Sequence, residues 1–395
     1  MADTVESRKD ILEPRLRLVA WEITRRCNLY CAHCRASAED VDYGGELSTD
    51  ECFRLIDQIV EVGKPILILT GGEPLCRPDV FDIGRYAAKK GLRVVLGTNG
   101  TLIDDDVARR LKQVPVSRVG VSIDFPGTAL QDEFRGKRGA FDEAVEGIKQ
   151  SQRAGIEVQI NSTITKKNAA LIGELLDLAL ELGAVAFHPF MLVPTGRGKD
   201  LADIALSAEE HERVLNWIYD KQAELGDRIS FKPTDAPHYM RIAIQRRGGG
   251  RMMSRKGLIN QAPMEIPLSP PLRKGEVSSV PHGHHAMGEM TRGCLAGTGF
   301  CFISHVGRVQ GCGYLDVEVG NVRDDSFDSI WSNSEVFERL RDLSNLKGKC
   351  GVCEFKRPCG GCRARAYEAT GDYLEAEPYC IYQPKAARGS EARPA

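Results

Sequence analysis

The sequence predicts an α/β fold: a partial (β/α)6 barrel followed by a small cysteine-rich domain. Three observations predict it. Short apolar runs rich in β-formers recur along the first half of the chain, amphipathic helical segments alternate with them, and the thirteen cysteines gather towards the two ends. Near-continuous apolar runs are typical of parallel strands covered on both faces. Strands that alternate with helices form a full or partial barrel.

Six segments are predicted to be strands: 17–25, 65–72, 93–100, 118–124, 157–165 and 184–193. Five helices are predicted between and after them, at 48–62, 78–90, 104–113, 140–154 and 168–182. Ser48 or Thr49 is the expected N-cap of the first helix, because acidic residues follow in its first turn.

The motifs that carry chemistry follow the predicted strands. In such barrels the active site lies on loops at the carboxyl ends of the strands. Four segments fall at such ends: Cys27–Cys34, Gly71–Pro74, Thr98–Gly100 and Ser122–Asp124. We therefore expect these loops to meet in one site.

The chain divides into four expected regions. The barrel is expected over 15–240, and a segment rich in glycine, proline and charge at 245–290 is expected to be a flexible insertion. Residues 291–384 form the expected cysteine-rich domain, and 385–395 form an expected disordered tail. The 395 residues suffice for one large domain and a smaller one.

The composition is that of an ordinary protein with a sizeable core, since 42% of residues are hydrophobic and 27% are charged. A net charge of −2 favours neither a nucleic-acid partner nor a membrane surface. No apolar run approaches the roughly 18 residues that a membrane span needs. The polar N-terminus lacks the apolar stretch of a secretory signal, so a cytoplasmic location is expected.

Cys27, Cys31 and Cys34 are spaced C-x3-C-x2-C. In a reducing cytoplasm, clustered thiols indicate metal binding before disulfides. A structural zinc site needs four protein ligands, whereas three thiolates suit three irons of a [4Fe–4S] cube and leave the fourth iron open. The alternatives are a zinc site completed by His33 and a loop of buried cysteines without metal.

This spacing after the first strand, followed by Gly71–Pro74 (GGEP) after the second, resembles the pattern of radical S-adenosylmethionine (SAM) enzymes. The resemblance covers nearly the whole chain. It implies that the open iron chelates the amine and carboxylate of SAM. One electron from the cluster then cleaves SAM to methionine and a 5′-deoxyadenosyl radical.

The resemblance also implies contacts to SAM. The methionine amine is expected at Gly71, Gly72, Glu73 and Pro74, where glycines permit close backbone approach. Polar residues at other strand ends are the remaining candidates, with capping or turn roles as the alternative: Asn99, Ser122, Asp124, Arg135 and Asn161. The loop 194–198 is expected near the adenine.

The C-terminal cysteines resemble the SPASM extension of many radical SAM enzymes, which holds auxiliary iron–sulfur clusters. The resemblance implies one set of Cys294, Cys301, Cys312 and Cys362 and another of Cys350, Cys353, Cys359 and Cys380. The last pair of "CGVCEFKRPCGGC" is C-x2-C where the family often has C-x3-C, so the partition and the number of clusters, one or two, stay open. Structural zinc is the alternative. Cys52 and Cys76 fit neither set, and Cys52 is expected in the core.

Several segments, among them "AWEITRRCN" and "LVPTGRGK", resemble the heme b synthases of the siroheme-dependent pathway. This implies a tetrapyrrole substrate, iron-coproporphyrin III, with two propionates decarboxylated oxidatively to vinyl groups. A flavodoxin or ferredoxin type of electron donor and an electron acceptor are implied as partners. The alternatives are a didecarboxysiroheme deacetylase, a heme d1 maturase and a peptide-modifying SPASM enzyme. A non-enzymatic iron–sulfur carrier is disfavoured, because it would need neither an open iron nor the GGEP loop, and a zinc-ribbon binding protein is a further alternative.

A substrate with four carboxylates predicts basic side chains in the cavity. The candidates are Arg197, Lys199, Arg363 and Arg365, each of which has a solvated or structural role as its alternative. Histidines that could face the cavity or bind metal are His188, His238, His282, His284 and His285, again with hydrogen-bonded or solvated roles as the alternative.

Overall fold

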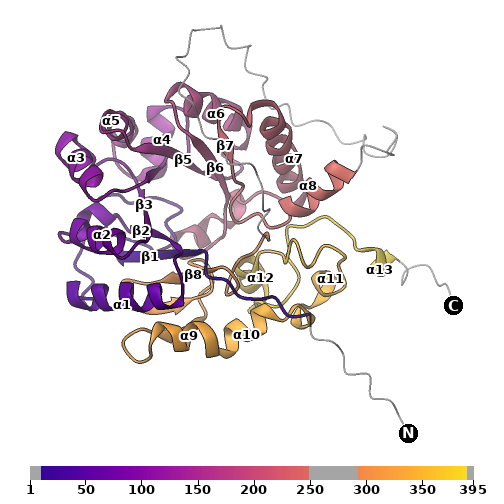
Figure 1. Cartoon of the computed structure of the whole chain (residues 1–395). Helices are drawn as coiled ribbons and strands as arrows, with labels where there is room; N and C mark the ends of the chain where they lie inside the picture. Colours follow the sequence, from indigo (N-terminus) through magenta and orange to yellow (C-terminus); the bar gives the residue numbers. More distant parts are fainter. Residues whose placement is uncertain (1–9, 249–291, 389–395) are drawn as a thin grey trace, which may run out of the picture.

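A computed structural model describes residues 10–248 and 292–388 of the chain (Figure 1). Within these residues, ten strands form one sheet in the order β10-β9-β8-β1-β2-β3-β4-β5-β6-β7. The strands from β1 to β7 are parallel neighbours in sequence order. The predicted partial barrel with a cysteine-rich C-terminal domain is confirmed.

All six predicted strands are present: β1 (Leu18–Thr24), β2 (Ile66–Gly71), β3 (Arg93–Thr98), β4 (Arg118–Ser122), β5 (Glu157–Ile164) and β6 (Ala186–Met191). The five predicted helices are α1 (Thr49–Val62), α2 (Val80–Lys89), α3 (Asp105–Gln113), α5 (Ala140–Arg153) and α6 (Ile172–Glu181). Three further α-helices and one further strand of the barrel were not predicted: α4 (Thr128–Arg135), α7 (Ala208–Leu225), α8 (Tyr239–Gly248) and β7 (Ser230–Phe231).

The start of α1 shows how local sequence fixes an element. The Ser48 hydroxyl accepts a hydrogen bond from the Glu51 amide at 3.3 Å, and the Glu51 carboxylate accepts one from the Ser48 amide at 2.7 Å. This reciprocal capping box satisfies two amides that have no partner inside the helix. Ser48, rather than Thr49, is therefore the N-cap.

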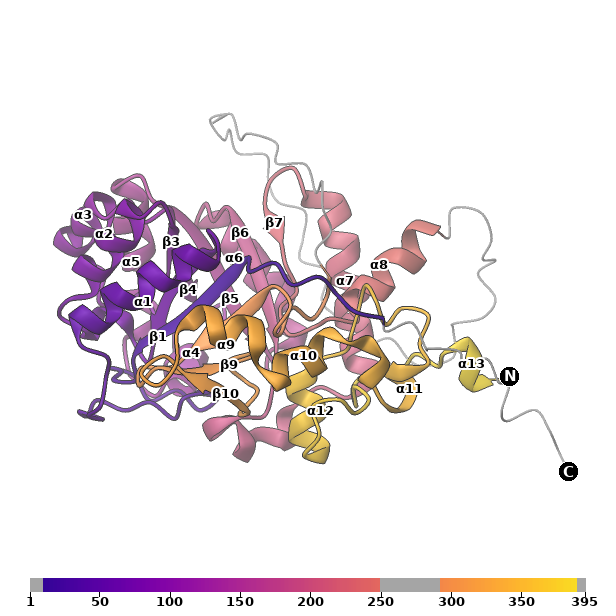
Figure 2. The same ribbon diagram turned by 60° about the horizontal axis from the view of Figure 1, so that its bottom comes forward.

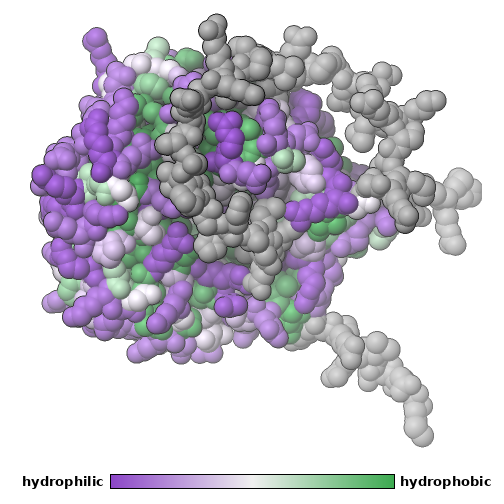
Figure 3. Space-filling view, turned by 45° about the horizontal axis from the view of Figure 1, so that its top comes forward, coloured by the Kyte–Doolittle hydropathy of each residue, from purple (hydrophilic) through white to green (hydrophobic). Residues whose placement is uncertain are grey.

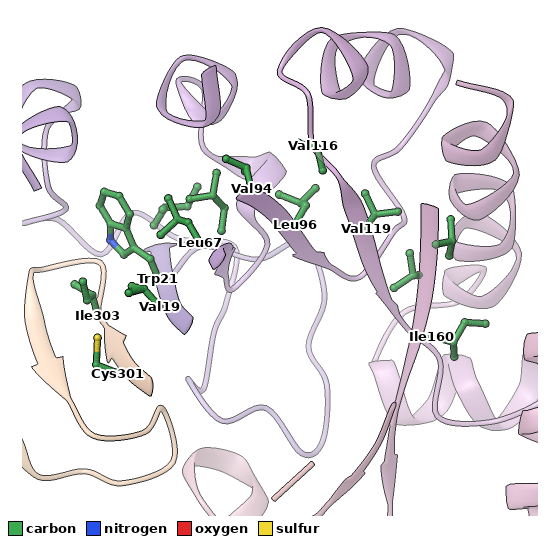
Figure 4. Close-up of a cluster of buried hydrophobic side chains, with 14 of the residues drawn as sticks. Val19, Trp21, Leu67, Val94, Leu96, Val116, Val119, Ile160, Cys301 and Ile303 are labelled. Carbon is green, nitrogen blue, oxygen red and sulfur yellow. The ribbon is translucent and has the colours of Figure 1, made fainter. Parts of the chain in front are cut away.

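The core lies between the strands and the helices that cover them. Figure 4 shows Val19 and Trp21 of β1 beside Leu67, Val94 and other apolar side chains of successive strands. Trp21 and Val19 are fully buried. Along a strand, successive side chains point to opposite faces, so the intervening positions face the interior of the barrel.

The C-terminal domain continues the barrel sheet. β8 (Phe300–Ile303) pairs in parallel with β1, and β9 (Arg308–Gln310) and β10 (Glu318–Asn321) extend the sheet antiparallel. Four helices complete the domain: α9 (Phe327–Asn333), α10 (Glu335–Arg341), α11 (Gly348–Gly351) and α12 (Arg363–Thr370). In Figure 2, α9 lies in front of the strands, and α10, α11 and α12 lie to its right. The two expected domains therefore share one sheet.

The expected insertion and tail differ from the structure where it describes them. Residues 245–248 are the last residues of α8, and the first residues of the expected disordered tail form α13 (Lys385–Arg388). The remainder of both segments, with His282, His284 and His285, lies outside the described residues.

No helix in the described ranges combines the length and apolar character that crossing a membrane requires. The face in Figure 3 is mostly hydrophilic, with smaller hydrophobic areas between the polar side chains.

Arg323 ties the C-terminal domain to the start of α1. Its guanidinium contacts both carboxylate oxygens of Glu51, at 2.7 and 3.2 Å, and donates to the carbonyls of Gly45 and Glu46. The hydrogen bond from Arg323 and the bond from Ser48 lower the pKa of Glu51 to about 2. Glu51 therefore stays charged down to well below pH 5.

We expect Arg323→Ala to lower the free energy of unfolding by about 1 kcal/mol, since the pair is exposed. A carboxylate with a depressed pKa stabilises the folded state above its unfolded pKa, so the loss should be constant between pH 5 and 8. It should shrink in high salt. Arg109→Ala, which removes an exposed pair within α3, is the control. A loss that varies across pH 5 to 8 would contradict the assignment.

Candidate iron–sulfur and cofactor site

The loop after β1 holds its three cysteines among backbone donors. Cys27 and Cys31 are buried, and Cys34 packs against them. The amide of Leu29 donates to the Cys27 sulfur at 3.4 Å, and the amide of Ala38 donates to the Cys34 sulfur at 3.3 Å. Hydrogen bonds to cysteine sulfur accompany iron–sulfur ligation, so the loop fits three thiolate ligands.

Burial sets the protonation of two of these thiols. It raises the pKa of Cys27 to about 12 and also raises the pKa of Cys31. Without a cation the thiols of Cys27 and Cys31 would therefore stay protonated at neutral pH. Metal ligation requires thiolates and releases these protons.

Two predicted residues, Asp124 and Arg135, meet beside Cys31. The Arg135 guanidinium lies 3.7 Å from the Cys31 sulfur and 2.6 Å from Asp124 Oδ2. Asp124 is fully buried and also accepts a hydrogen bond from the Thr163 amide at 2.7 Å. A buried charge needs such compensation. Asp124 therefore orients Arg135, which brings a positive charge to the thiol.

His33 was the alternative fourth ligand of a zinc site. Its ring stacks on Phe134 with centroids 4.4 Å apart, and its Nε2 lies 3.9 Å from Asp124. Burial lowers its pKa to about 4, so the ring is neutral at pH 7. The His33 ring therefore contacts Phe134 and Asp124.

The GGEP loop lies directly against the cysteine loop. A Cβ on Gly71 would come 2.4 Å from the Thr24 carbonyl oxygen, and one on Gly72 would come 2.3 Å from that of Arg25. The amide of Gly72 donates to the Thr24 carbonyl at 2.8 Å. Only glycine permits this approach. Pro74 then begins a short 3-10 turn.

Glu73 braces the ends of two strands. Its buried carboxylate accepts hydrogen bonds from the Thr98 hydroxyl at 2.8 Å, the Asn99 amide at 2.8 Å and the Leu75 amide at 3.1 Å. Burial raises the pKa of Glu73 to about 7. The Asn99 side chain lies 4.0 Å from the Cys27 sulfur. The predicted loops after β2 and β3 are thus joined at the cysteines.

A polar layer lines the interior near the same edge. Ser122, Asn161 and His188 are partners in register on β4, β5 and β6. Gly97 of β3 pairs with Gly120 of β4, which lies two residues before Ser122 on the same strand. A Cβ on Gly120 would come 2.9 Å from Asn161 Nδ2. The side chains of Asn161 and Thr70 fill the space beside Gly120 and Gly97. Ser122 and Asn161 thus share one layer with the candidate His188.

Arg197, a predicted substrate contact, instead braces the cysteine loop. Its guanidinium donates to the carbonyls of Cys31 at 2.9 Å and Ala38 at 3.0 Å, and lies over the Tyr30 ring. Gly196 has a left-handed φ of 54°, and a Cβ there would come 2.2 Å from the Arg35 carbonyl oxygen. The predicted loop 194–198 therefore packs on the cysteines.

The other predicted basic contacts are also engaged by protein groups. Lys199 lies 3.4 Å from Glu368 at the surface. Arg363 donates to the carbonyls of Tyr373 and Glu375, and Arg365 pairs with the buried Glu377 at 3.0 Å. These contacts give the side chains structural roles in the C-terminal domain.

One predicted auxiliary set lines a single cavity together with His238: Cys350, Cys353, Cys359 and Cys380. Backbone amides donate to three of these sulfurs at 3.4 Å, those of Glu377 to Cys350, Phe355 to Cys353 and Gly361 to Cys359. Four thiols around one cavity, with amides aimed at sulfur, fit a cube ligated by four cysteines.

Of the other predicted set, Cys312 and Cys362 pack in one cluster, and the amide of Cys294 donates to the carbonyl of Cys359 at 3.0 Å. Burial raises the pKa of Cys312 well above its usual range, with further increases from the charges of Asp235, Cys362 and Cys294. Cys301 does not join them. It is fully buried in the hydrophobic core on β8, beside Ile303 (Figure 4), and burial alone raises its pKa.

In the described part of the chain, no three side chains of His, Cys, Asp or Glu converge as ligands of a single metal ion. A four-iron cube distributes its thiolates over separate irons, so its ligands need not converge on one point. Cys52 is fully buried against Leu47 and Arg77, as expected for a core cysteine. Cys76 ends the turn after Glu73.

A contact that the sequence did not predict joins the two cysteine-bearing regions. Arg35, next to Cys34, donates to the carbonyl of Gly313, next to Cys312, at 3.2 Å. The same guanidinium forms an ion pair with the buried Glu22, which His305 contacts at 2.7 Å. A glutamate inside an apolar strand, at position 22, was the signal that could have revealed this pair.

Comparisons with known proteins agree with this geometry. Residues 21–179 match the radical SAM superfamily, and residues 294–363 match the SPASM iron–sulfur cluster-binding domain. Two relatives named AdoMet-dependent heme synthase, AdoMet being SAM, come from Methanosarcina barkeri and Nitratidesulfovibrio vulgaris. The first is 49% identical, covering 93% of this chain and 97% of the relative; the second is 47% identical, covering 94% of each.

A Fe-coproporphyrin III synthase of Methanosarcina barkeri is 33% identical, covering 92% of this chain and 87% of its own. The solved structure of Streptococcus suis SuiB bound to precursor peptide SuiA has a TM-score of 0.68 and 18% identity. It covers 94% of this chain and 77% of that one, and it supports the fold alone.

The fold and the cysteine loops define a radical SAM enzyme. The chain belongs to the SPASM-containing radical SAM family that includes these heme synthases. The radical SAM domain implies a [4Fe–4S] cluster and SAM, and the SPASM domain implies auxiliary iron–sulfur clusters.

We expect Gly72→Ala to abolish the radical SAM cluster while the auxiliary clusters remain. A methyl group on residue 72 would lie 2.3 Å from the carbonyl oxygen of Arg25, too close for any van der Waals contact, so the cysteine loop must move. Overpacking of this kind typically costs about 1–3 kcal/mol. Iron and sulfide per chain and the electron paramagnetic resonance (EPR) signal of the cluster measure the effect. Gly127→Ala is the control, since no atom lies within 4 Å of its added Cβ. A full cluster content in Gly72→Ala would refute the steric argument.

Proposed function

We propose that the protein is a heme synthase that decarboxylates two propionates of iron-coproporphyrin III oxidatively to vinyl groups, giving protoheme. Relatives at 49% and 47% identity that carry the name AdoMet-dependent heme synthase support this substrate class. Conversion of one propionate to vinyl removes one hydrogen atom, CO2 and one electron. The reaction therefore needs both a hydrogen abstractor and an electron acceptor.

The single structural observation that supports an oxidative reaction is the contact between Arg35 and Gly313. It joins the loop of Cys34 to the segment of Cys312, a proposed auxiliary ligand. An acceptor beside the radical site would take the electron that each decarboxylation releases. A flavodoxin or ferredoxin type of donor and a final electron acceptor complete the proposed redox partners.

When bound, the open-iron cluster and SAM supply the 5′-deoxyadenosyl radical. The chain's own contribution is to hold and shield the reactants. Arg135, oriented by Asp124, brings positive charge to the cysteine loop. We assign SAM contacts to the loop at Gly71 and Gly72 and to polar residues of the interior layer such as Asn161.

The basic side chains predicted for the propionates are engaged elsewhere, so we assign substrate contacts to the interior layer. Ser122, Asn161 and His188 face that space at one level of the barrel. Burial lowers the pKa of His188 well below its usual range, so its ring is neutral. A neutral imidazole can ligate iron or accept a hydrogen bond.

An anaerobic assay tests the proposal. Reconstituted protein receives SAM, a strong reductant and iron-coproporphyrin III, and mass spectrometry follows the porphyrin. We expect loss of two carboxyl groups as CO2, with one 5′-deoxyadenosine for each vinyl group formed. The triple variant Cys27→Ala/Cys31→Ala/Cys34→Ala should produce neither.

Other results of this assay would point to a different substrate. Deoxyadenosine with an unchanged porphyrin would reject this substrate. Conversion of didecarboxysiroheme to iron-coproporphyrin III would then identify a deacetylase, the reading that the 33% identical relative favours. If neither iron-coproporphyrin III nor didecarboxysiroheme is converted, the next substrates to test are heme d1 precursors and then peptides.

We expect Arg35→Gln to uncouple the two half-reactions. Loss of the contact to Gly313 and of the ion pair to Glu22 misplaces the auxiliary segment, and a misplacement of about 1 Å can cost a hundredfold in rate. The protoheme rate should fall at least tenfold, while deoxyadenosine still forms. Arg26→Gln, which breaks an exposed pair with Asp40, is the control. An unchanged ratio of deoxyadenosine to vinyl would contradict this role.

A further inference from the structure

Basic side chains that the sequence did not single out surround a cavity away from the cysteine loop. The cavity has a volume of about 690 Å³, within the range of about 300–1,000 Å³ that is typical of small-molecule sites. Four basic residues line it: Arg15, Arg17, Lys64 and Lys232. Within the described ranges, no acidic residue is among its lining residues.

This basic cavity lies at the amino ends of the barrel strands. Leu18 and Ile66, the first residues of β1 and β2, pair in register, and both line it. Lys232 directly follows β7, which pairs with the first two residues of β6. The cavity therefore reaches from the first strands of the barrel to the last. The cysteine loop follows the opposite, carboxyl end of β1.

One face of β1 connects the basic cavity with the cysteine loop. Side chains at alternate positions of a strand point to the same face, so Leu18 at the cavity and Glu22 share the face that looks into the barrel. Glu22 forms the ion pair with Arg35 of the cysteine loop. Four steps along a strand separate the two positions by about 13 Å. A molecule that extends along this face therefore has one end at the cavity and the other near the cysteine loop.

The cavity gathers positive charge that no lining acid balances. Arg15, Lys64 and Lys232 form no ion pair with another residue of the described ranges. Like charges around one cavity repel each other, and an anion between them relieves this repulsion. The Lys232 side chain is exposed, yet the surrounding protein lowers the pKa of its ammonium, and the charge of Asp235 opposes this only in part. Both observations fit a side chain that faces a cavity rather than open solvent.

The other walls of the basic cavity are largely apolar, with Leu18, Ile66, Leu295 and Trp331 among them. Ligand sites typically combine such walls with a few polar or charged groups that fix the orientation of the ligand. A tetrapyrrole presents matching groups, because its flat ring is apolar and its propionates are anionic. In the proposed reaction, two of the four propionates of iron-coproporphyrin III are lost and two remain in protoheme.

We infer that this cavity binds the two propionates that remain as carboxylates in the product, with Arg15, Lys64 and Lys232 as their contacts. The two propionates that react then lie towards the cysteine loop. The inference rests on the proposed function, because it divides the four carboxylates into a reacting pair and a retained pair. A site that contacts only the retained pair recognises substrate and product alike.

Titration of the reconstituted full-length protein with protoheme and with protoheme dimethyl ester, followed by the Soret absorbance, tests the inference. The ester has the same ring but no free carboxylate. Lys232→Gln should weaken protoheme binding about tenfold, because it removes a hydrogen bond between charged groups, and should leave ester binding unchanged. Iron-coproporphyrin III should lose affinity by the same factor. Lys232→Arg, which keeps the charge, should retain most of the affinity.

Two further variants complete the design. Arg15→Gln/Lys64→Gln removes charge from the β1 and β2 side of the cavity and should give the same selective loss, so the test does not depend on the folding of one variant. Lys149→Gln is the control, since Lys149 is an exposed lysine of α5 that does not line the cavity. It should bind both porphyrins and the ester as the wild type does.

The results separate this inference from the proposed function. Unchanged protoheme binding in both cavity variants would overturn the inference, even if the wild type converts iron-coproporphyrin III. An effect on iron-coproporphyrin III alone would assign the cavity to the reacting propionates and overturn it as well. Equal weakening of protoheme and its ester in both variants would show that no carboxylate is recognised there, with the same consequence. A selective loss in a protein that converts no iron-coproporphyrin III would reject the proposed reaction but keep the cavity as a tetrapyrrole carboxylate site.

Discussion

The ion pair between Arg35 and Glu22 is the interaction on which the arrangement of the site depends. Glu22 belongs to a buried strand of the barrel, and Arg35 belongs to the cysteine loop, so the pair fixes the loop over the strand ends. The second arm of Arg35 reaches Gly313 in the C-terminal domain. Breaking a buried pair typically costs about 3–5 kcal/mol, because it strands a charge. One guanidinium therefore sets the position of two cysteine-bearing segments.

Close backbone packing follows from that arrangement. The cysteine loop is pressed between the loop after β2 and the loop after β6, and both loops meet it through glycine, at Gly72 and Gly196. Arg197 then donates to carbonyls of the same loop. The loop has no room to move when its thiols change state. Such rigidity limits the reorganisation that a redox or radical step would otherwise require.

The sequence was informative where chemistry and pattern coincide. Apolar runs identified six strands, and C-x3-C-x2-C identified the loop that the structure builds around buried sulfur. Spacing could not reveal that Cys301 faces the core, because that depends on the pairing of β8 with β1, 282 positions away. For the same reason, Arg197 could be placed near the site but not given its bracing role. The helix α7 was missed although Ser207 and Glu210 form a capping box at its start.

The parallel pairing of β8 with β1 has a consequence for biosynthesis. β1 leaves the ribosome first, yet one of its edges stays unpaired until residues 300–303 have been made. An exposed apolar strand edge is a template for aggregation. The interval covers most of the chain, so the barrel sheet keeps one open edge until the C-terminal domain supplies the strand that closes it.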